Sequence, residues 1–423
     1  MKRLNTSPIS GMQELLPASQ AVFDKIKGRI GEVYHRHGFV SIETPIIDRT
    51  DILLAKAGGD TEKQIYKVVK TAEAAEGADQ ALRFDHTVPL ARYVVEHEND
   101  LTFPFKVTQI GRNFRGERAQ KGRYREFYQC DVDVIGRGNL PIYYDADIIL
   151  TLLDAYSSFE LSTPVRARVS NRKILTGAIE ALNLQGKSGE IYNIIDHAEK
   201  VPREKTEAAF DAIGVNANAK EKILALIDIA GPVNEVSAKL TELGLTNETF
   251  EAGIKELTEV LELVESASTA GAVVADMKIV RGLDYYTGTV FEFMLPEYPE
   301  VGSVGGGGRY ENLAGYFTDQ ILPGVGGSIG LTRLFYVLSE KGLLRDGLMQ
   351  PVEVAVVPIS DAELKYAVKV ACELRAAGQS VTLVAGDKKL GDKMKYASKV
   401  AQAAIVIGEN EVKTGKYQVK RFE

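Results

Sequence analysis

The segment FPFKVTQIGRNFRGERAQKGRYREFYQCDVDVIG, residues 103–136, decides the fold of this chain. Its two ends, residues 103–114 and residues 124–136, have the alternating, aromatic-rich pattern of β-strands. The stretch between them, RGERAQKGR, predicts a long charged loop. Two strands joined in this way can form an antiparallel hairpin, and the rest of the fold prediction starts from that hairpin.

Charged side chains crowd the hairpin and its loop. They are Arg112, Arg115, Glu117, Arg118, Lys121, Arg123 and Arg125. Such a run is often only a solvated surface, but strand alternation predicts that Arg115 and Glu117 share one face. A guanidinium can bind a phosphate through two parallel hydrogen bonds, and a nearby carboxylate can accept from an amine or help to hold Mg²⁺. The hairpin is therefore a candidate site for phosphate chemistry.

On the N-terminal side of the hairpin the pattern is first helical and then extended. Apolar residues three or four positions apart predict an amphipathic helix over residues 18–37, which Gly38 stops. Strand patterns follow at FVSIETPII, residues 39–47, and at QALRF, residues 80–84. Together with the hairpin, these elements predict a domain of helices and an antiparallel sheet.

On the C-terminal side the pattern changes twice. Residues 171–266 are helical and acidic, with glycines near the ends of the periodic runs, which predicts an inserted helical domain. Strand patterns return at residues 277–295, continue through the glycine cluster GSVGGGGRY, and lead through GVGGSIG into a helix, LTRLFYVLSEKG. The first domain is therefore expected to be split around the insertion.

The last part of the chain follows a linker at residues 347–351 and alternates strands with helices, which predicts an α/β domain with a largely parallel sheet. A chain of 423 residues is expected to contain two or three domains. We expect an α+β domain at residues 1–170 and 267–346, a helical insertion at residues 171–266, and the α/β domain at residues 351–423.

The composition narrows the class of protein. No stretch reaches the roughly 18 consecutive apolar residues of a membrane span, and the first residues lack the apolar core of a secretory signal, so we expect a cytoplasmic protein. Cys130 and Cys372 lack the neighbours of a zinc or redox motif, and the five histidines include no HExxH pair, so we expect no resident metal. The net charge of -7 argues against indiscriminate coating of nucleic acid.

The glycine clusters do not match the common nucleotide-binding motifs. A phosphate-binding loop ending at Gly186-Lys187-Ser188 would need glycine where Ala181 stands. Neither residues 305–308 nor residues 324–330 fit GxGxxG, so a dinucleotide fold lacks its fingerprint. Two explanations stay open and are compatible: tight strand packing, and a ligand that lies on bare backbone.

Three arginines stand at starts of predicted strands or helices. Arg115 begins the charged loop, Arg281 precedes the aromatic pair of VRGLDYYTG, and Arg333 begins the helix after GVGGSIG. Each alone is most simply a surface residue. Together with the glycines they are typical of phosphoryl or nucleotidyl transfer, in which a protein positions the reactants and stabilises charge.

Several segments resemble class II aminoacyl-tRNA synthetases. Residues 38–54, 114–136 and 324–334 resemble the motifs numbered 1, 2 and 3 of that class, in the same order. RGLDYYTGTVFEF and GGGGRYENL, residues 281–293 and 305–313, resemble signatures of the histidyl-tRNA synthetase family. The resemblance covers nearly the whole chain. It implies a class II catalytic domain, a C-terminal anticodon-binding domain, and an enzyme that joins histidine to its tRNA with ATP.

The resemblance also implies roles for single residues. The amino acid would be bound by Asp85, His86, Thr87, Arg115, Gln129, Asp133, Arg281, Tyr285 and Tyr286. Among these, Arg115 and Arg281 would be catalytic, because they stabilise charge on the α-phosphate and on the histidine carboxylate. ATP, with Mg²⁺ on its phosphates, would be bound by Arg115, Glu117, Arg123 and Arg333. No residue is assigned as the general base of the transfer step.

Further implied contacts are with macromolecules. The acceptor end of the tRNA would meet Arg118, Gln120 and Lys121. In the last domain, Lys389 and Lys393 stand four positions apart, which predicts one helix face that could contact anticodon-stem phosphates. Pro45 belongs to the motif that forms the dimer interface in this class, so a homodimer is expected.

Two other readings stay open. One is the synthetase-like regulatory subunit of ATP phosphoribosyltransferase, which typically lacks both the anticodon-like domain and an intact RGLDYYTG segment. The other is a class II synthetase for a different amino acid, which the two histidine signatures disfavour.

Overall fold

The computed structural model describes residues 4–55, 60–71, 79–120, 122–159, 161, 163–280, 286–343 and 352–422. The described residues form two compact units. The large unit contains those within 4–13 and 27–343, and the small unit contains those within 14–26 and 352–422. Arg281, Tyr285 and Lys121, which the sequence singles out, lie outside the described residues.

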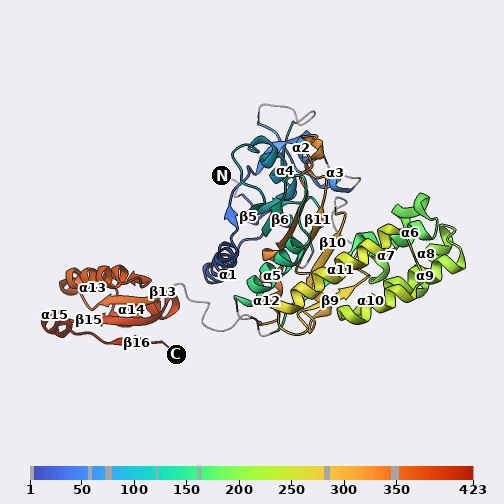
Figure 1. The fold of residues 1–423 in the computed structure, drawn as a ribbon. Coiled ribbons are helices and arrows are strands. Elements are labelled where there is room, and N and C mark those ends of the chain that lie inside the picture. Colours follow the sequence, from blue (N-terminus) through green and yellow to red (C-terminus); the bar gives the residue numbers. More distant parts are fainter. Residues whose placement is uncertain are drawn as a thin grey trace. The chain divides into compact units, whose positions relative to one another are not determined.

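A mainly antiparallel sheet forms the centre of the large unit (Figure 1). Among the described residues it contains, in spatial order, β1 (Val40–Ser41), β5 (Phe105–Phe114), β6 (Glu126–Ile135), β12 (Gly324–Ile329), β11 (Gly305–Tyr310), β10 (Thr289–Met294), β7 (Arg166–Asn171), β9 (Val273–Asp276) and β8 (Ala230–Gly231). Only the β1–β5 and β7–β9 pairs among these strands are parallel. The strands from both sides of residues 171–266 thus meet in one sheet, as the split-domain prediction requires.

The predicted hairpin is confirmed. β5 and β6 pair antiparallel, from Phe105 opposite Ile135 to Phe114 opposite Glu126. The prediction that Arg115 and Glu117 share the face of a strand is wrong, because β5 ends at Phe114 and both residues lie in the loop beyond it. The chain nevertheless stays paired there, since the Arg115 amide donates to the carbonyl of Arg125 at 2.9 Å.

The predicted N-terminal helix is confirmed as α1 (Pro17–Arg36), and Gly38 follows it with a φ of 82°. The single strand predicted at residues 39–47 is wrong in extent, because the structure divides it into β1 and β2 (Ile47–Arg49). Pro45 stands between them, and proline has no N–H to donate to a sheet.

Smaller elements complete this part of the unit. They are β3 (Lys67–Val68), β4 (Gln80–Leu82), α2 (Thr50–Leu53), α3 (Asp60–Gln64), α4 (Thr87–Glu96), α5 (Tyr143–Ser157) and α12 (Leu331–Glu340). Of these, α5 contacts the sheet at β12, where its Leu152 lies beside Gly327 and the ring of Phe291. α12 follows the glycine-containing strand β12 and contacts β6.

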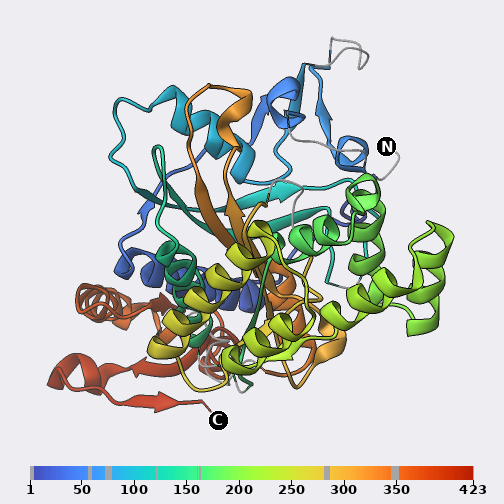
Figure 2. The same ribbon diagram turned by 45° about the vertical axis from the view of Figure 1, so that its right-hand side comes forward.

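The helical prediction for residues 171–266 is confirmed, with β8 as the exception. The helices are α6 (Arg172–Ala181), α7 (Ser188–Ala198), α8 (Arg203–Ala212), α9 (Ala217–Ile227), α10 (Val233–Glu242) and α11 (Glu248–Ala267). In Figures 1 and 2, α8 and α9 lie away from the sheet, whereas α11 returns toward it. Asn171, Asn216 and Asn247 cap α6, α9 and α11, each accepting a hydrogen bond from a backbone N–H of the first turn.

The small unit has the predicted α/β pattern. Its sheet order is β14 (Val381–Leu383), β13 (Val352–Pro358), β15 (Ala401–Ile407) and β16 (Val419–Arg421), and the first three strands are parallel. Side chains of α13 (Leu364–Ala376) cover one face of β13 and β15, and those of α14 (Leu390–Val400) cover the other. A short helix, α15 (Glu409–Thr414), precedes β16. Burial on both faces explains why β13 and β15 are largely apolar.

One prediction in this unit is wrong. Lys393 does not face solvent: only 3% of it is exposed, and its Nζ donates to the carbonyls of Pro358 at 3.0 Å and Ile359 at 3.3 Å. Lys389 is exposed but precedes the first residue of α14, so the two lysines do not form one exposed helix face. The ammonium of Lys393 fastens α14 to the end of β13, and this makes it unsuitable for binding phosphate.

Candidate active site

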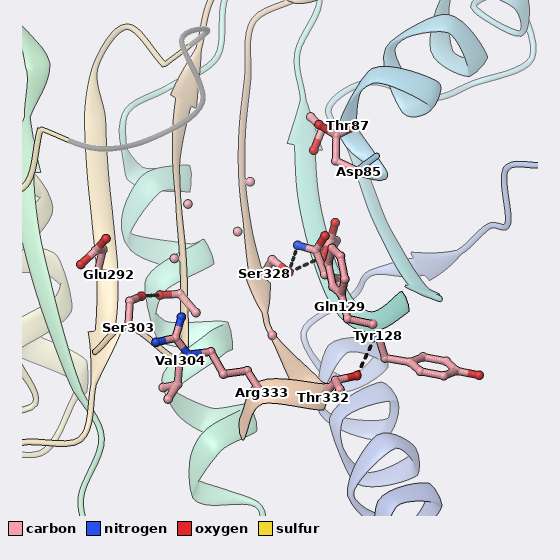
Figure 3. A pocket seen from close by; sticks show the side chains of 18 of the residues that line it. Asp85, Thr87, Tyr128, Gln129, Glu292, Ser303, Val304, Ser328, Thr332 and Arg333 are labelled. Atoms are coloured by element: carbon pink, nitrogen blue, oxygen red, sulfur yellow. Dashed lines mark hydrogen bonds between the residues drawn. The ribbon is translucent and has the colours of Figure 1, made fainter. Parts of the chain in front are cut away.

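A cavity of about 420 Å³ opens on the sheet where β6, β10, β11 and β12 lie side by side. Its lining comes from these strands, from the hairpin loop, from the segment before α4 and from the start of α12 (Figure 3). Asp85 and Thr87 lie at one side of it, and Ser303 and Arg333 lie at another. Segments far apart in the sequence therefore contribute to one site.

Glycines of β11 and β12 form part of the lining, and the structure supports both explanations that the sequence left open. A Cβ on Gly307 would lie 2.1 Å from the carbonyl oxygen of Gly326, and a Cβ on Gly326 would lie 2.0 Å from Oδ1 of Asp133. Any side chain at these positions would therefore displace its neighbours. Because the same glycines line the cavity, their bare backbone is also exposed to a ligand.

A row of polar side chains on β6 forms one wall of the cavity. Gln129, Asp131 and Asp133 alternate along the strand, so all three point to the same face. We call this set the carboxylate wall. Both carboxyl groups are nearly inaccessible to solvent, which is unusual for acidic residues and costly unless a function or a partner compensates.

Burial changes the acid–base behaviour of Asp133 in particular. Its pKa is raised to about 8, first by burial and then by the nearby charge of Asp131. Tyr310 donates its hydroxyl to Oδ1 of Asp133 at 3.0 Å, which acts in the opposite direction by favouring the ionised form. Asp133 therefore carries a proton in a pH range where an ordinary aspartate has lost it.

Asp85 approaches the cavity from the turn before α4. Its Oδ1 accepts the backbone N–H of Val88 at 3.0 Å, which fixes the carboxyl group at the start of that helix. Burial raises the pKa of Asp85, while the Val88 bond and the charge of Arg115 lower it. Thr87 lines the cavity beside it. This pair is well placed to bind a cationic amine.

Three arginines line the cavity, and we call them the arginine group: Arg115, Arg123 and Arg333. The guanidinium of Arg115 lies 4.4 Å from the ring of Phe84 and 5.0 Å from that of Phe127, and its Nε donates to the Phe84 carbonyl at 3.3 Å. These contacts fix the position of the guanidinium beside the cavity.

The other two arginines have different contacts: Arg123 is near a carboxylate, and Arg333 is bound to a backbone carbonyl. Arg123 lies 3.8 Å from Glu117, and 46% of its side chain is exposed, so the pairing is weak and open to solvent. Arg333 donates from Nη2 to the carbonyl of Val301 at 2.5 Å.

The structure brings most of the predicted site residues together. The cavity is lined by Asp85, Thr87, Arg115, Glu117, Arg123, Gln129, Asp133, Tyr286 and Arg333. Arg118 and Gln120 are exposed on the hairpin loop and do not line it. Lys389 and Lys393 belong to the small unit.

The prediction that His86 binds the ligand directly is wrong. His86 is 0% exposed and is absent from the lining of the cavity. Its Nδ1 lies 2.9 Å from Oδ2 of Asp131, behind the carboxylate wall. The cause is the local backbone: the chain turns into α4 at this point, so Asp85 and Thr87 face the cavity while His86 faces the sheet.

Sequence reasoning missed several residues of the lining, among them Tyr128, Asp131, Glu292, Ser303, Tyr310, Ser328 and Thr332. Asp131 could have been found, because it stands midway between Gln129 and Asp133 and period-two alternation gives all three one face. Tyr128, Glu292, Tyr310, Ser328 and Thr332 lie inside segments that resemble family motifs, but nothing in those segments shows which of their side chains face the cavity.

Comparisons with known proteins agree over nearly the whole chain. A family model described as histidyl-tRNA synthetase matches residues 11–334, and one described as an anticodon binding domain matches residues 353–423. The histidine–tRNA ligase of Clostridium tetani is 43% identical over 99% of this chain and 94% of its own length.

Two solved structures extend the comparison. A histidyl-tRNA synthetase from a Nostoc species is 34% identical with a TM-score of 0.88, over 99% of this chain and 97% of that one. An ATP phosphoribosyltransferase regulatory subunit/histidyl-tRNA synthetase from Bacillus halodurans is 20% identical with a TM-score of 0.78, over 96% of this chain and 99% of that one, and this likeness shows the fold alone.

The sheet, the helix that follows its glycine-rich strand and the charged cavity between them define a class II aminoacyl-tRNA synthetase. Enzymes of this class use ATP as a substrate. The chain belongs to the histidyl-tRNA synthetase family. Its activity is that of a histidine–tRNA ligase, and the predicted family, fold class and activity are confirmed.

No helix in the described part of the chain is long and apolar enough to cross a membrane.

Proposed function

We propose that the cavity on β6 binds histidine and ATP together and performs the activation step. The observation that carries this assignment is the meeting of two kinds of group in one cavity, buried carboxylates for the amino acid and partly exposed arginines for the nucleotide. In the first step an oxygen of the histidine carboxylate attacks the α-phosphorus of ATP. The bond to the departing pyrophosphate breaks, and histidyl adenylate remains.

The histidine would lie against the carboxylate wall. Its α-ammonium group would donate to Asp85 and Thr87, whose carboxylate and hydroxyl oxygens can accept. Its imidazole has one donor and one acceptor, which suits the pair of Asp133 and Tyr310. Gln129 and Tyr286 would complete the pocket. An apolar side chain of similar size would leave these buried polar groups without partners, so it would be rejected.

ATP would lie along the arginine group. Arg115, fixed by the two aromatic rings, would face the α-phosphate and the attacking carboxylate, both of which are anionic. Arg123 and Arg333 would bind the remaining phosphates or the base. At an effective dielectric constant near 20, two unit charges about 4 Å apart interact by roughly 4 kcal/mol, so a fixed guanidinium can stabilise the transition state substantially. Arg281 would assist, by the family resemblance alone.

Mg²⁺ would enter with the nucleotide. No group of three or more potential metal-ligating side chains occurs among the described residues. Two carboxylates, Glu117 and Glu292, do line the cavity, and Mg²⁺ in nucleotide sites is commonly held by one or two carboxylates plus phosphate oxygens. These residues therefore fit an ion that arrives on ATP, where it would neutralise phosphate charge.

The second step needs the tRNA. The 3′-terminal ribose hydroxyl attacks the acyl carbon of histidyl adenylate, and AMP leaves. Arg118 and Gln120 are exposed on the loop between β5 and β6, where they can contact the acceptor end, and Lys121 would act with them. Residues 351–423 would bind the anticodon arm, with Lys389 contributing an exposed charge. Residues 171–266 would form the insertion domain beside the catalytic domain of residues 1–170 and 267–346.

The enzyme is proposed to be a cytoplasmic homodimer. β1 ends the large sheet, and Val40 on it is 52% exposed; Ile46 and Ile47, which follow, are exposed as well. An exposed apolar strip next to a sheet edge is suited to a partner subunit. Light scattering of the purified protein tests this: a mass near twice 46.2 kDa is expected, and a monomer would contradict it.

The regulatory-subunit alternative predicts a protein that cannot activate an amino acid. Pyrophosphate exchange into ATP separates the possibilities, with histidine, proline, threonine and glycine compared in parallel. Exchange with histidine alone supports the assignment. Absence of exchange by folded protein with Mg²⁺ would favour the regulatory subunit, and exchange with another amino acid would overturn the pocket assignment.

A further inference from the structure

A ring of hydrogen-bonded side chains lies in and behind the carboxylate wall. His86 Nδ1 lies 2.9 Å from Oδ2 of Asp131, and the hydroxyl of Ser328 donates to the other oxygen of Asp131. Gln129 Nε2 donates to Ser328 Oγ at 2.9 Å. Asn113 Nδ2 donates to Gln129 Oε1 at 2.9 Å. It also lies 3.4 Å from His86 Nδ1, which brings the two ends of the ring together, although Nδ1 cannot accept from it while donating to Asp131.

The ring has an inner and an outer part. Gln129, Asp131 and Ser328 line the cavity, as Figure 3 shows for Gln129 and Ser328. His86 and Asn113 are both 0% exposed and do not line it. Any influence of His86 on a ligand must therefore pass through the residues of the wall.

The chemistry of the donors fixes the orientation of each member. The carboxyl oxygens of Asp131 accept one hydrogen bond from the N–H of His86 Nδ1 and another from the Ser328 hydroxyl. Ser328 has then used its single hydrogen, and its oxygen accepts from the amide of Gln129. This leaves the Gln129 oxygen turned toward Asn113. Without the His86 donor, Asp131 and Ser328 can reorient, and the amide of Gln129 is no longer held.

His86 itself is fixed on several sides. The Gln109 amide donates to its carbonyl oxygen at 3.3 Å. A Cβ on Gly111 would lie 3.2 Å from His86 Nε2, so the glycine leaves just enough room for the imidazole. Nε2 is buried and has no hydrogen-bond partner among the described residues. Its polar contacts within the ring are therefore made through Nδ1.

We propose that His86 is a positioning residue for histidine activation, which holds Asp131 and, through Ser328, Gln129 in one arrangement toward the amino acid. The inference rests on the proposed function of the cavity. It predicts that loss of the Nδ1 donor weakens histidine binding while ATP binding is retained, because the arginine group lies outside the ring.

Two substitutions at this position separate the donor from the bulk of the side chain. His86→Leu fills the space but cannot donate, whereas the Nδ2 of an asparagine takes nearly the place of imidazole Nδ1, so His86→Asn can still donate to Asp131. The test measures histidine and ATP KM values and kcat by pyrophosphate exchange, with histidine binding to the enzyme alone followed by calorimetry. His197→Leu, at a half-exposed histidine of α7, is the matched control.

His86→Leu is expected to raise the histidine KM about 10- to 100-fold, with the ATP KM changed less than about threefold. His86→Asn is expected to restore most of the affinity, and His197→Leu to behave as the unmodified enzyme. Equal losses in His86→Leu and His86→Asn would overturn the proposal, as would equal increases in both KM values. Unchanged kinetics in His86→Leu would overturn it as well.

A second variant keeps the proposal testable if His86→Leu does not fold. Asn113→Ala removes the hydrogen bond that Asn113 Nδ2 donates to Gln129 Oε1. The same selective rise in the histidine KM is expected. A normal histidine KM in Asn113→Ala would contradict the ring as the route of action. If the unmodified enzyme itself shows no exchange with histidine, the proposed function fails, and that result is distinct from any outcome with the variants.

Discussion

The carboxylate wall and the arginine group share one cavity but are built in opposite ways. Asp131 and Asp133 are each 4% exposed and belong to a central strand. Arg123 is 46% exposed on its side chain and comes from a loop. Gln129 and Asp131 of the wall belong to the hydrogen-bonded ring, and Asp133 accepts from Tyr310. Arg123, by contrast, supplies positive charge that solvent and salt can still reach.

This difference indicates that the two regions have separate roles, in selectivity and in charge stabilisation. A buried carboxylate that lacks its intended partner is unfavourable, so the wall can reject ligands that do not match its donors and acceptors. An arginine can bind any phosphate oxygen within reach, so the arginine group contributes rate and affinity more than selectivity. Each prediction below changes one of the two and leaves the other intact.

The largest effect is expected at Arg115. Arg115→Ala should lower kcat for pyrophosphate exchange by about 10²- to 10³-fold, because the fixed charge beside the α-phosphate is lost. Steady-state exchange at saturating histidine and ATP measures it. Arg112→Ala is the matched control, since Arg112 pairs with Glu126 on the same hairpin and does not line the cavity. A kcat in Arg115→Ala within threefold of normal would mean that the arginine group does not act on the reacting phosphate.

The next effect is expected in the wall. Asp133→Asn should raise the histidine KM by roughly 10- to 100-fold with little change in the ATP KM, because the amide cannot reproduce both hydrogen-bonding states of the carboxyl group. Initial rates with each substrate varied in turn measure this. Asp154→Asn, at an exposed carboxylate paired with His37, should change neither. If both KM values rose together, the separation of the two regions would be wrong.

The same substitution should alter the pH dependence of stability. The pKa of Asp133 is about 8 in the folded protein, against about 3.9 for an ordinary aspartate. Because the folded pKa is the higher one, protonated Asp133 stabilises the folded state. This contribution to the free energy of unfolding is complete below about pH 4 and is lost as the pH rises toward 8. Asp133→Asn removes this loss, so the variant should gain stability relative to the unmodified protein by about 2 to 4 kcal/mol between pH 5 and pH 8.

Urea unfolding at the two pH values measures that gain. Asp319→Asn, at an exposed carboxylate, is measured beside it as the control. A constant offset between Asp133→Asn and the unmodified protein would show that Asp133 is ionised throughout.

The smallest effect is expected from salt. Raising the ionic strength from about 0.05 M to 0.5 M should increase the ATP KM a few-fold, because the exposed charge of Arg123 is screened. The histidine KM should change less than twofold, since the wall is buried. Exchange rates at fixed free Mg²⁺ measure both, and a larger response of the histidine KM would reverse the comparison.

The sequence predicted the arginine group better than the wall, for a physical reason. Arginines and glycines in recognisable order mark a phosphate site locally, and three of the expected cationic or acidic loop residues, Arg115, Glu117 and Arg123, do line the cavity. The reasoning behind Arg115 and Glu117 was nevertheless wrong, because both lie beyond the end of β5. The family resemblance suggested ligand contact at His86, and the spacing of a lysine cluster suggested it at Lys393, while the fold buries both side chains.

What the sequence determined by itself was local and periodic: the β5–β6 hairpin, the helical character of residues 171–266, the alternating last domain, and the family. What only the tertiary structure decided was which side chains share a surface. Ser328 meets Asp131 because β12 pairs with β6, and Tyr310 reaches Asp133 from β11, one strand further away. Such contacts depend on strand order and register between distant segments, and no local pattern in the chain specifies either.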